Sequence, residues 1–378
     1  MRDPDRLRIA VVLQTPKDPQ SAVYMSHQGI NTALERLGHV VETVAPADFS
    51  LLRSAGGRWT PLLYPMAVAS WLRRRRDAFD LVMFHSYAGC LATVRRGGSG
   101  CRSLVVFHGV EPLYHHELKE ESRRQEKPLS RRYRLLQEQL MPVMLRAACR
   151  KADAVMCLNR VERRFLIERK WVTLSSVQLF AHGVPPEFYL EERPPRPVRT
   201  LLFVGQWLPM KGIAYLREAA VALLSEDPSL RLVLAGTLVS EPEVLSGFPS
   251  ALRDRLVVKP RVEPTALAEL YRAADVFLFP SLYEAFSRAI AEAMASALPI
   301  VTTGVGIAAD ALRDGDSALV VPKRSSDALV AAVRRLRRDS ALAARLGKAA
   351  AIAAGPYRLD VVEPQTVMTI LDAAGAPR

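Results

Sequence analysis

Two glutamates, Glu284 and Glu292, carry the clearest chemical signal in this sequence. They lie between Pro280 and Pro299, in PSLYEAFSRAIAEAMASALP, where an apolar run gives way to an alanine-rich stretch of strong helix propensity. The pattern predicts a buried strand, a turn with the first carboxylate, and a helix with the second about two turns along. The first N–H groups of a helix lack internal partners and lie at the positive end of its dipole. A diphosphate bound there would leave both carboxylates free to accept from sugar hydroxyls, which predicts a nucleotide-sugar site.

Two further side chains could take part in such chemistry. Lys211 precedes Gly212 in a predicted turn after the apolar run 201–204, and its ammonium could reach a phosphate oxygen as a point charge. The alternative is a solvated loop lysine. His108 lies in VVFHG, Val105 to Gly109, which ends a predicted strand, and ligands bind at the carboxyl ends of strands in open α/β sheets. From the residues alone, a structural histidine is the more common interpretation.

Alternating strands and helices must position these groups. Short apolar runs separated by helical patterns predict βαβ units and a parallel sheet in each half of the chain. The expected strands are Ile9–Leu13, Val40–Val44, Leu81–Phe84, Leu104–Phe107 and Ala154–Leu158, then Leu201–Val204, Leu230–Leu234, Leu256–Val258, Val276–Phe279, Ile300–Thr302 and Ala318–Val321.

The length of 378 residues exceeds the roughly 250–300 at which single cores stop growing, so two domains are expected. The charged, proline-rich segment EERPPRPVR, Glu191 to Arg199, predicts the linker between them. We therefore expect an N-terminal domain over 1–190, a linker over 191–199, a C-terminal domain over 200–355 and a terminal segment over 356–378.

The composition is typical of a globular enzyme, because apolar residues make up 49% of the chain and charged residues 24%. The apolar run Ile9–Leu13 is too short for a signal peptide or a membrane span. The four cysteines show no metal-binding spacing, so the cytoplasm is the expected compartment.

The net charge of +13 suggests an anionic partner. Basic residues cluster over Arg73–Arg76 and again from Lys119 to Lys151, where leucines at helical spacing indicate an amphipathic helix. A solvated helix face, an anionic membrane surface and nucleic acid are the alternatives. Nucleic acid ranks last because no recognised binding motif accompanies the charge.

The pattern GVGIAA, Gly304 to Ala309, imitates a dinucleotide-binding fingerprint after a predicted strand. It is short and lies late in its domain, whereas that fingerprint belongs to the first βα turn. We therefore do not expect a nicotinamide cofactor.

Several motifs together resemble the retaining family-4 glycosyltransferases of the GT-B fold. PSLYEAFSRAIAEAMASALPIV is similar to the family's PSxxEGFGxxxxEAMAxGxPV, in which two glutamates are separated by seven residues. The resemblance extends over LLFVGQWLPMKG, LVLAG, LAELYRAADVFLFPS and AHGVPPEF. It implies two Rossmann-like domains facing each other across a cleft, with a last helix that crosses back to the first domain, here Tyr357 to Ala373.

The resemblance also implies roles for individual residues. Glu284 is expected to contact the hydroxyls of the donor sugar and Glu292 to accept from the ribose, while His108 is expected beside the donor sugar and the reacting centre. Donor binding as a whole is carried over to Gly205, Gln206, Lys211, Arg261, Val262, Ala285, Phe286, Ser287, Arg288 and Glu292. Loose contacts to the acceptor or donor are carried over to Ser21, Tyr24 and His27 in the first loop.

The sequence departs from the family pattern at three positions. Gln206 stands where the family has an arginine, and an amide brings no charge to the leaving group. Arg288, in the turn that opens the helix, is a candidate for supplying that charge. Ala285 and Ser287 replace two glycines, although Ser287 is suited to cap the helix that follows.

The expected function is a retaining transfer of a sugar from a UDP- or GDP-linked donor to an acceptor hydroxyl on a glycan or a lipid-linked molecule. No cofactor and no metal are expected, since no DxD-like carboxylate pair follows a strand and Lys211 with a helix N-terminus can take the phosphate charge. The protein is expected in the cytoplasm or peripherally on the inner face of the membrane, without nucleic acid. A non-catalytic nucleotide-sugar binder or partner subunit, and a GT-B phosphorylase or epimerase, are the alternatives.

Overall fold

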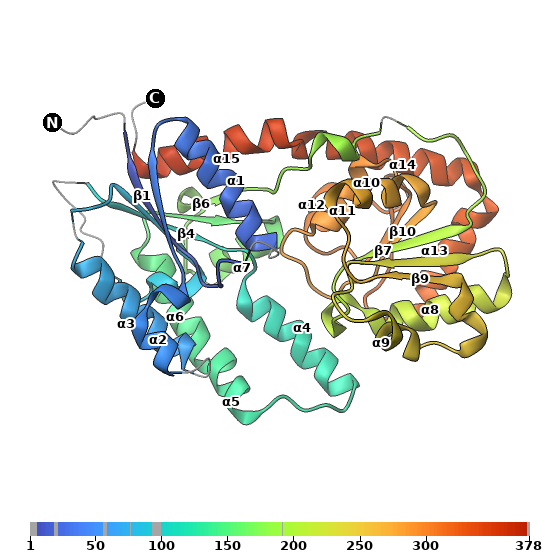
Figure 1. Ribbon diagram of the computed structural model, residues 1–378, viewed down its shortest axis with the longest axis horizontal. Coiled ribbons are helices and arrows are strands. Elements are labelled where there is room, and N and C mark those ends of the chain that lie inside the picture. Colours follow the sequence, from blue (N-terminus) through green and yellow to red (C-terminus); the bar gives the residue numbers. More distant parts are fainter. Residues whose placement is uncertain are drawn as a thin grey trace. The chain divides into compact units, whose positions relative to one another are not determined.

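The computed structural model describes residues 6–18, 22–55, 59–75, 77–92, 100–190 and 192–375 (Figure 1). The chain divides into two compact units, each of which is described by itself. Unit 1 comprises residues 1–116, 128–182 and 360–378, and unit 2 comprises residues 117–127 and 183–359.

Unit 1 is built on a six-stranded parallel sheet in the order β2-β1-β3-β4-β5-β6. Its strands are β1 (Arg8–Val12), β2 (Val40–Val44), β3 (Leu81–His85), β4 (Arg102–Val106), β5 (Ala154–Cys157) and β6 (Val177–Leu179). The five strands expected in this half are confirmed, and β6 is an addition. Three residues are too few to show an apolar pattern, so β6 has no clear sequence signal.

The helices of unit 1 cover both faces of this sheet. They are α1 (Ala22–Arg36), α2 (Ser50–Ala55), α3 (Thr60–Arg73), the first part of α4 (Glu111–Arg124), α5 (Arg131–Arg134), α6 (Met141–Lys151), α7 (Arg160–Glu168) and, apart from its first residue, α15 (Leu359–Ala374). In Figure 1, α2, α3 and α6 lie on one side of the sheet and α1 on the other. The predicted stop after α1 is confirmed, since Gly38 adopts a φ of +90° that other residues disfavour.

Unit 2 contains a second six-stranded parallel sheet, in the order β12-β11-β10-β7-β8-β9. Its strands are β7 (Thr200–Val204), β8 (Arg231–Ala235), β9 (Leu256–Lys259), β10 (Val276–Phe279), β11 (Ile300–Thr302) and β12 (Leu319–Val320). Every strand expected in this half is confirmed. The chain runs outward from β7 to β9 and then returns to place β10 beside β7, so the strand order reverses between β7 and β10. Ligands of doubly wound sheets bind at this reversal, beyond the carboxyl ends of the strands.

Helices also cover both faces of the second sheet. They are α8 (Ile213–Glu226), α9 (Glu241–Ser246), α10 (Pro264–Ala273), α11 (Arg288–Ala295), α12 (Ile307–Ala311), α13 (Ser326–Arg338) and α14 (Ser340–Ala354). In Figure 1, α8 and α13 lie on one side of the sheet and α10 and α11 on the other. The Ala-rich α11 is buried over most of its length and is only eight residues long.

The boundary between the units differs from the predicted one. It falls between His182 and Gly183, before the proline-rich segment predicted as a linker. Arg193 explains why that segment belongs to unit 2: its guanidinium donates to the carbonyls of Tyr271 at 2.6 Å, Ala274 at 2.8 Å and Ser296 at 2.7 Å. Charge and proline content indicated a solvated connection, whereas the arginine caps orphan carbonyls near helix ends. Glu191 lies outside the described residues.

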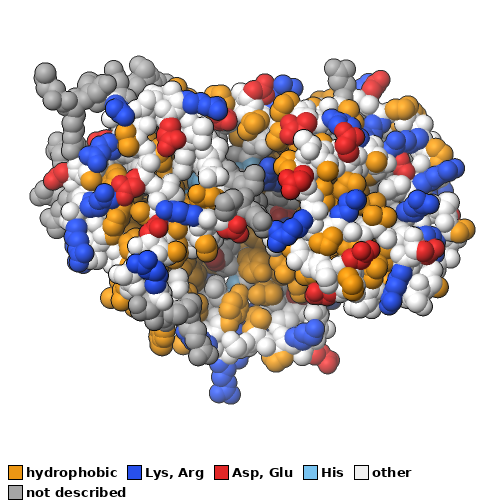
Figure 2. Space-filling view, viewed as in Figure 1, with side chains coloured by type: hydrophobic (Ala, Val, Ile, Leu, Met, Phe, Trp, Pro, Cys, Tyr) orange, Lys and Arg blue, Asp and Glu red, His pale blue; other side chains and the backbone are white. Residues whose placement is uncertain are grey.

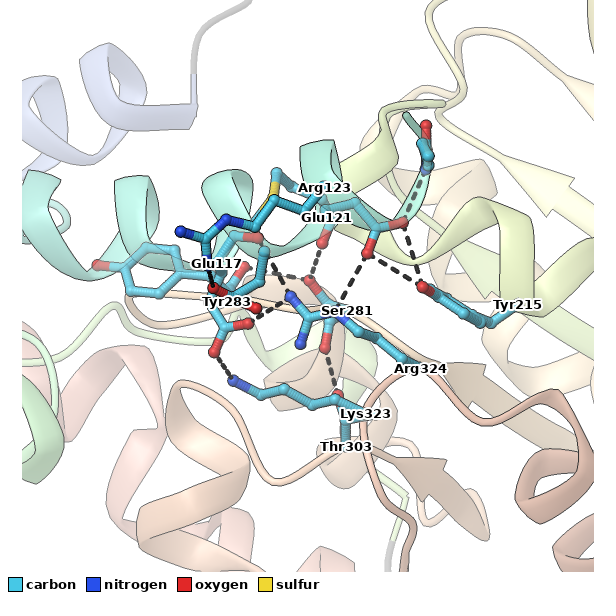
Figure 3. A network of polar contacts seen from close by, with 12 residues as sticks. Glu117, Glu121, Arg123, Tyr215, Ser281, Tyr283, Thr303, Lys323 and Arg324 are labelled. Carbon is cyan, nitrogen blue, oxygen red and sulfur yellow. Dashed lines mark hydrogen bonds and ion pairs between the residues drawn. The ribbon is translucent and has the colours of Figure 1, made fainter. Parts of the chain in front are cut away.

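A polar network fixes the second part of α4, residues 117–124, within unit 2 (Figure 3). The Glu117 carboxylate pairs with Lys323 at 2.6 Å and with Arg324 at 2.7 Å. Glu121 accepts from the Arg324 guanidinium at 3.1 Å and from the Tyr215 hydroxyl at 3.0 Å. Glu121 is almost completely buried, so these donors compensate the cost of removing its charge from water.

Candidate active site

Lys211 reaches the strand reversal of unit 2 through a close approach of two loops. The loop after β7 ends in a short 3₁₀ turn, Pro209–Lys211, followed by Gly212 at a φ of +71°. A Cβ atom on Gly212 would lie 2.0 Å from the carbonyl oxygen of Pro280, the first residue after β10. Only glycine fits both the backbone angle and the contact. The KG pair of the sequence therefore brings the Lys211 ammonium against the loop that carries the first glutamate.

Lys211 and Glu284 form an ion pair, with 2.5 Å between Nζ and Oε1. The Ser281 hydroxyl donates to the same carboxylate oxygen at 2.7 Å, and the ammonium lies 5.5 Å from the centroid of the Phe279 ring. The carboxylate is largely buried and the ammonium less so. The structure therefore brings together two residues whose predicted ligands are adjacent groups, a phosphate and a sugar.

Ser287 does not act as the predicted helix cap. It precedes α11 with a φ of +74°, and its hydroxyl, although buried, has no hydrogen-bond partner among the described residues. A capping serine has extended backbone angles, which let its oxygen accept from the N–H groups of the first turn. The prediction was wrong because the turn needs a left-handed residue here, the conformation that the family's glycine adopts without strain.

The GVGIAA segment supports this turn. The Ile307 amide donates to the Phe286 carbonyl at 2.7 Å, and a Cβ atom on Gly306 would lie 2.5 Å from that carbonyl oxygen. It would also lie 2.8 Å from Cβ of Glu284. Gly306, which belongs to the pattern similar to a dinucleotide fingerprint, thus allows close packing against the turn that contains Glu284. Phe286 itself is buried and meets the Tyr357 ring edge to face, with 5.9 Å between centroids.

Glu292 is buried on α11 rather than exposed to solvent. The Tyr271 hydroxyl donates to it at 3.0 Å, and Nε of Arg288 lies 3.9 Å from its other oxygen. Burial raises the pKa of Glu292 to about 7, against the opposing effects of Arg288 and Tyr271. The Glu292 carboxyl can therefore be protonated or ionised near neutral pH. Arg288 is close enough to stabilise the ionised form.

The other predicted donor residues lie beyond the carboxyl ends of strands in the same sheet. Gly205 and the exposed Gln206 follow β7, and the Gly205 amide donates to the carbonyl of Ala235 at 2.9 Å. Arg261 and Val262 follow β9, two strands away from β7. Ala285 is half-buried in the turn.

In unit 1, His108 lies in a group of four histidines. The His27 and His108 Nε2 atoms are 2.5 Å apart, and the His85 ring is 4.0 Å from that of His27 between centroids. His182 stacks on His108 with 5.6 Å between centroids. The pKa of His108 falls to about 4 through burial, and burial likewise holds those of His27 and His85 well below the usual value. The imidazoles of His27, His85 and His108 are therefore uncharged near neutral pH.

Sequence reasoning named His27 and His108 separately and missed His85 and His182. His85 is the last residue of β3, which pairs with β4, and the register aligns His85 with Val106 two residues before His108. The pairing of β3 with β4 would have shown that His85 and His108 are neighbours. A single sequence does not give the strand order, so this pairing could not be predicted. Tyr24 is half-buried on α1, and Ser21 lies outside the described residues.

Two family models match the chain. One is described as Glycosyltransferase Family 4 and matches residues 29–188, and the other as Glycosyl transferases group 1 and matches residues 191–352. This chain belongs to the family-4 glycosyltransferases. The recognition based on the sequence motifs is thereby confirmed.

Curated relatives of this family-4 member match part of its length. The D-inositol 3-phosphate glycosyltransferase of Geodermatophilus obscurus is 39% identical over 144 residues, which are 35% of this chain and 32% of the relative. The same-named protein of Nocardiopsis dassonvillei is 35% identical over 199 residues, which are 49% and 45% of the two chains. The chain thus spans less than half the length of these relatives.

Solved structures match the whole fold of this family-4 member. Sucrose-phosphate synthase from Thermosynechococcus elongatus has a TM-score of 0.76 at 19% identity, covering 98% of this chain and 100% of the other. WaaG, a glycosyltransferase involved in lipopolysaccharide biosynthesis, has a TM-score of 0.73 at 18% identity, covering 96% and 99%. Anabaena HepE in complex with UDP and glucose has a TM-score of 0.70 at 16% identity, covering 97% and 100%. The predicted GT-B fold class is confirmed.

Proposed function

We propose that this protein is a retaining glycosyltransferase that moves a sugar from a nucleotide-diphospho-sugar to an acceptor hydroxyl. The observation that carries the proposal is the Lys211–Glu284 pair at the strand reversal of unit 2, where α11 begins. A cation, a helix N-terminus and a carboxylate at one position suit a diphosphate joined to a sugar.

Each group has a distinct part in the proposed reaction. The sugar–phosphate bond breaks, the acceptor oxygen bonds to the same sugar carbon, and a nucleoside diphosphate and a proton are released. The Lys211 ammonium and the first amides of α11 stabilise the growing charge on the departing diphosphate, because fixed positive groups are most effective where charge develops. Glu284 accepts from the donor sugar and Glu292 from the ribose. His108 hydrogen-bonds to the donor sugar, as the family resemblance implies.

Known proteins support the choice of donor. HepE, whose fold this chain shares, has been solved with UDP and with UDP-glucose. We therefore rank a UDP-sugar first and a GDP-sugar second. The curated relatives are named for a glycosyl transfer to an inositol phosphate, which supports a hydroxyl-bearing acceptor. A glycan or a lipid-linked acceptor remains our proposal.

Binding and turnover of a donor panel test this function. UDP, GDP and their sugar conjugates should raise the melting temperature when they bind the folded state, and turnover should release free nucleoside diphosphate. Replacing Lys211 with alanine removes a charge-assisted contact and leaves Glu284 facing the phosphates, so donor affinity should fall by roughly 100-fold. Lys348→Ala, on the surface of the same unit, is the matched control and should bind normally.

The same assay separates the alternatives. Tight donor binding without product under any condition would favour a non-catalytic binder, which the exposed Gln206 and the strained Ser287 motivate. Turnover that conserves the nucleotide-sugar bond would indicate an epimerase, and phosphate-dependent glycan cleavage would indicate a phosphorylase. Equal donor affinity in Lys211→Ala and the wild type would contradict the proposed site. The transfer is proposed to need no metal and no cofactor.

An anionic membrane surface is the proposed location of the reaction, on the cytoplasmic side. Unit 1 exposes Trp59, Met66, Leu135 and Val143, with 51% to 64% of each residue accessible. The guanidinium of Arg132 lies 5.2 Å from the Trp59 ring centroid, so basic and apolar side chains intermix. Figure 2 shows hydrophobic side chains interspersed with Lys and Arg on the surface. Within the described residues, no helix has both the length and the apolar character of a membrane span.

Flotation with vesicles tests the membrane proposal. Binding should require anionic lipid and should weaken at high salt, because each basic residue near such a surface contributes about 1 kcal/mol. Leu135→Glu should reduce binding, whereas Leu174→Glu, at an equally exposed position, should not. Binding that neither lipid charge nor salt affects would contradict it.

A further inference from the structure

Three imidazoles of unit 1 converge from three different elements. His27 lies on α1, His85 ends β3 and His108 follows β4. The ring centroids are 4.0 Å apart for His27 and His85, 4.5 Å for His27 and His108, and 5.1 Å for His85 and His108. One ring nitrogen from each lies within 4.8 Å of the others.

Polar atoms of this group lack partners. Among the described residues, Nδ1 of His27, Nε2 of His85 and Nδ1 of His108 are buried without a hydrogen bond. An unsatisfied buried polar group costs about 1–3 kcal/mol, so three in one place call for an explanation. The Nε2 atoms of His27 and His108 lie 2.5 Å apart, so the group is closely packed.

We propose that His27, His85 and His108 form a binding site for a transition-metal cation of the Zn²⁺ class. Neutral imidazole is a preferred ligand of Zn²⁺ and of its neighbours in the first transition row, whereas Mg²⁺ and Ca²⁺ require oxygen ligands. The group formed by the described residues consists of imidazoles alone. Three histidines leave a fourth tetrahedral position open to water or to an anionic group.

The geometry requires a modest adjustment. Zn–N bonds of about 2.0–2.1 Å at tetrahedral angles separate the nitrogens by about 3.3 Å. The nitrogens of His27 and His108 are now closer than this, while each of the three pairs lies below 4.8 Å. Side-chain rotations can reach the required spacing, and His85 and His108 are anchored by neighbouring parallel strands.

The proposed metal site is made by residues of unit 1, whereas Lys211 and α11, which are proposed to take the phosphate charge, belong to unit 2. The metal site has one link to the proposed function. A cation that binds His108 would prevent this imidazole from hydrogen-bonding to the donor sugar, and the effect on transfer therefore rests on the proposed function. Zn²⁺ is therefore expected to inhibit transfer. Binding of the metal itself is measured without any substrate, so failure of the site and failure of the proposed function are distinguishable.

Titration of the untagged, chelator-treated full chain with Zn²⁺ tests the site. We expect one equivalent to bind with a dissociation constant below about 1 µM in competition with a chromophoric chelator. Co²⁺ should give the strong visible absorption of a tetrahedral site without the thiolate charge-transfer band that a cysteine ligand produces. Mg²⁺ should not compete. An absence of Zn²⁺ binding, or a thiolate band, would overturn the proposal.

Variants locate the metal. His85→Ala should weaken Zn²⁺ binding by at least about 100-fold, since even residues that only orient metal ligands contribute 10–100-fold. His116→Ala, outside the cluster, is the matched control and should bind like the wild type. Circular dichroism verifies that each variant is folded. If His85→Ala does not fold, His27→Gln serves as the ligand variant instead. Unchanged Zn²⁺ affinity in a folded ligand variant would overturn the site.

Discussion

Lys211 and Glu284 follow neighbouring strands of one sheet and pair through a 2.5 Å contact between Nζ and Oε1. The two residues are 73 positions apart in the chain, so the pair depends on the return of β10 to the side of β7. The Glu284 carboxylate neutralises the Lys211 ammonium. A donor phosphate that binds Lys211 must either share the ammonium with Glu284 or displace Glu284 from it. Phosphate binding is therefore linked to the position of the carboxylate that is proposed to bind the sugar.

Glu284→Gln should separate the two roles of this pair. The amide still accepts from Ser281 but no longer neutralises Lys211, so UDP affinity should rise a few-fold while kcat/KM for the sugar donor falls about 100-fold. Isothermal titration and initial rates measure the two effects. Glu192→Gln, which removes an exposed partner of Lys348, is the control. A parallel loss of UDP binding would contradict the proposed division of roles.

Gly212→Ala should be far more harmful than Gly315→Ala. Both glycines have a φ above +70°, but a Cβ atom on Gly315 meets open space, whereas on Gly212 it would lie 2.0 Å from the Pro280 carbonyl oxygen. We expect a loss of about 1 kcal/mol for Gly315→Ala and about 3 kcal/mol or more for Gly212→Ala. Urea unfolding measures the stabilities. Equal losses would mean that the loop contact is unimportant.

Ser287→Gly should stabilise the protein by roughly 0.5 to 1 kcal/mol. Glycine relieves the strain of the positive φ and removes a buried hydroxyl without a partner among the described residues, at some cost in chain entropy. Ser325 is the comparison, because its hydroxyl accepts from the Ala328 amide and caps α13. Ser325→Ala should therefore cost about 1 kcal/mol. If Ser287→Ala lowers the free energy of unfolding as much as Ser325→Ala does, the Ser287 hydroxyl caps α11 and the prediction is wrong.

Glu292 should make stability fall as pH rises from 4.5 to about 7. Its pKa is about 7 in the folded chain and 4.5 for the unperturbed group, so between these values the folded state holds the extra proton. The stabilisation from that proton is fully present below pH 4.5 and is lost as pH rises toward 7, by about 3 kcal/mol in total.

The difference in unfolding free energy between the wild type and Glu292→Gln, measured from pH 4.5 to 8, isolates this effect. The wild type should lose stability relative to the variant as pH rises. Glu269→Gln, at an exposed carboxylate on α10, should track the wild type at every pH. A pH-independent difference for Glu292→Gln would contradict the raised pKa.

The strands and the donor loop could be predicted because their signals are local. A run such as Val276–Phe279 is apolar over consecutive residues, and this is sufficient to indicate a strand buried on both faces. The motif with Glu284 and Glu292 needs only a turn and a helix to fix its spacing. The conformation of Ser287 was missed because serine is a common helix cap, whereas the positive φ of Ser287 is evident only in the folded turn.

The sequence alone indicates two parallel α/β sheets through its alternating apolar runs, and it indicates the family through the spacing of a few motifs. Both signals depend only on residues that are close together in the chain. Tertiary structure decides which distant side chains meet. It pairs Lys211 with Glu284, buries Glu292 against Tyr271 and gathers His27, His85 and His108 around one point. The order of strands in a sheet determines which loops converge, and that order arises from packing of the whole chain, so no single segment encodes it.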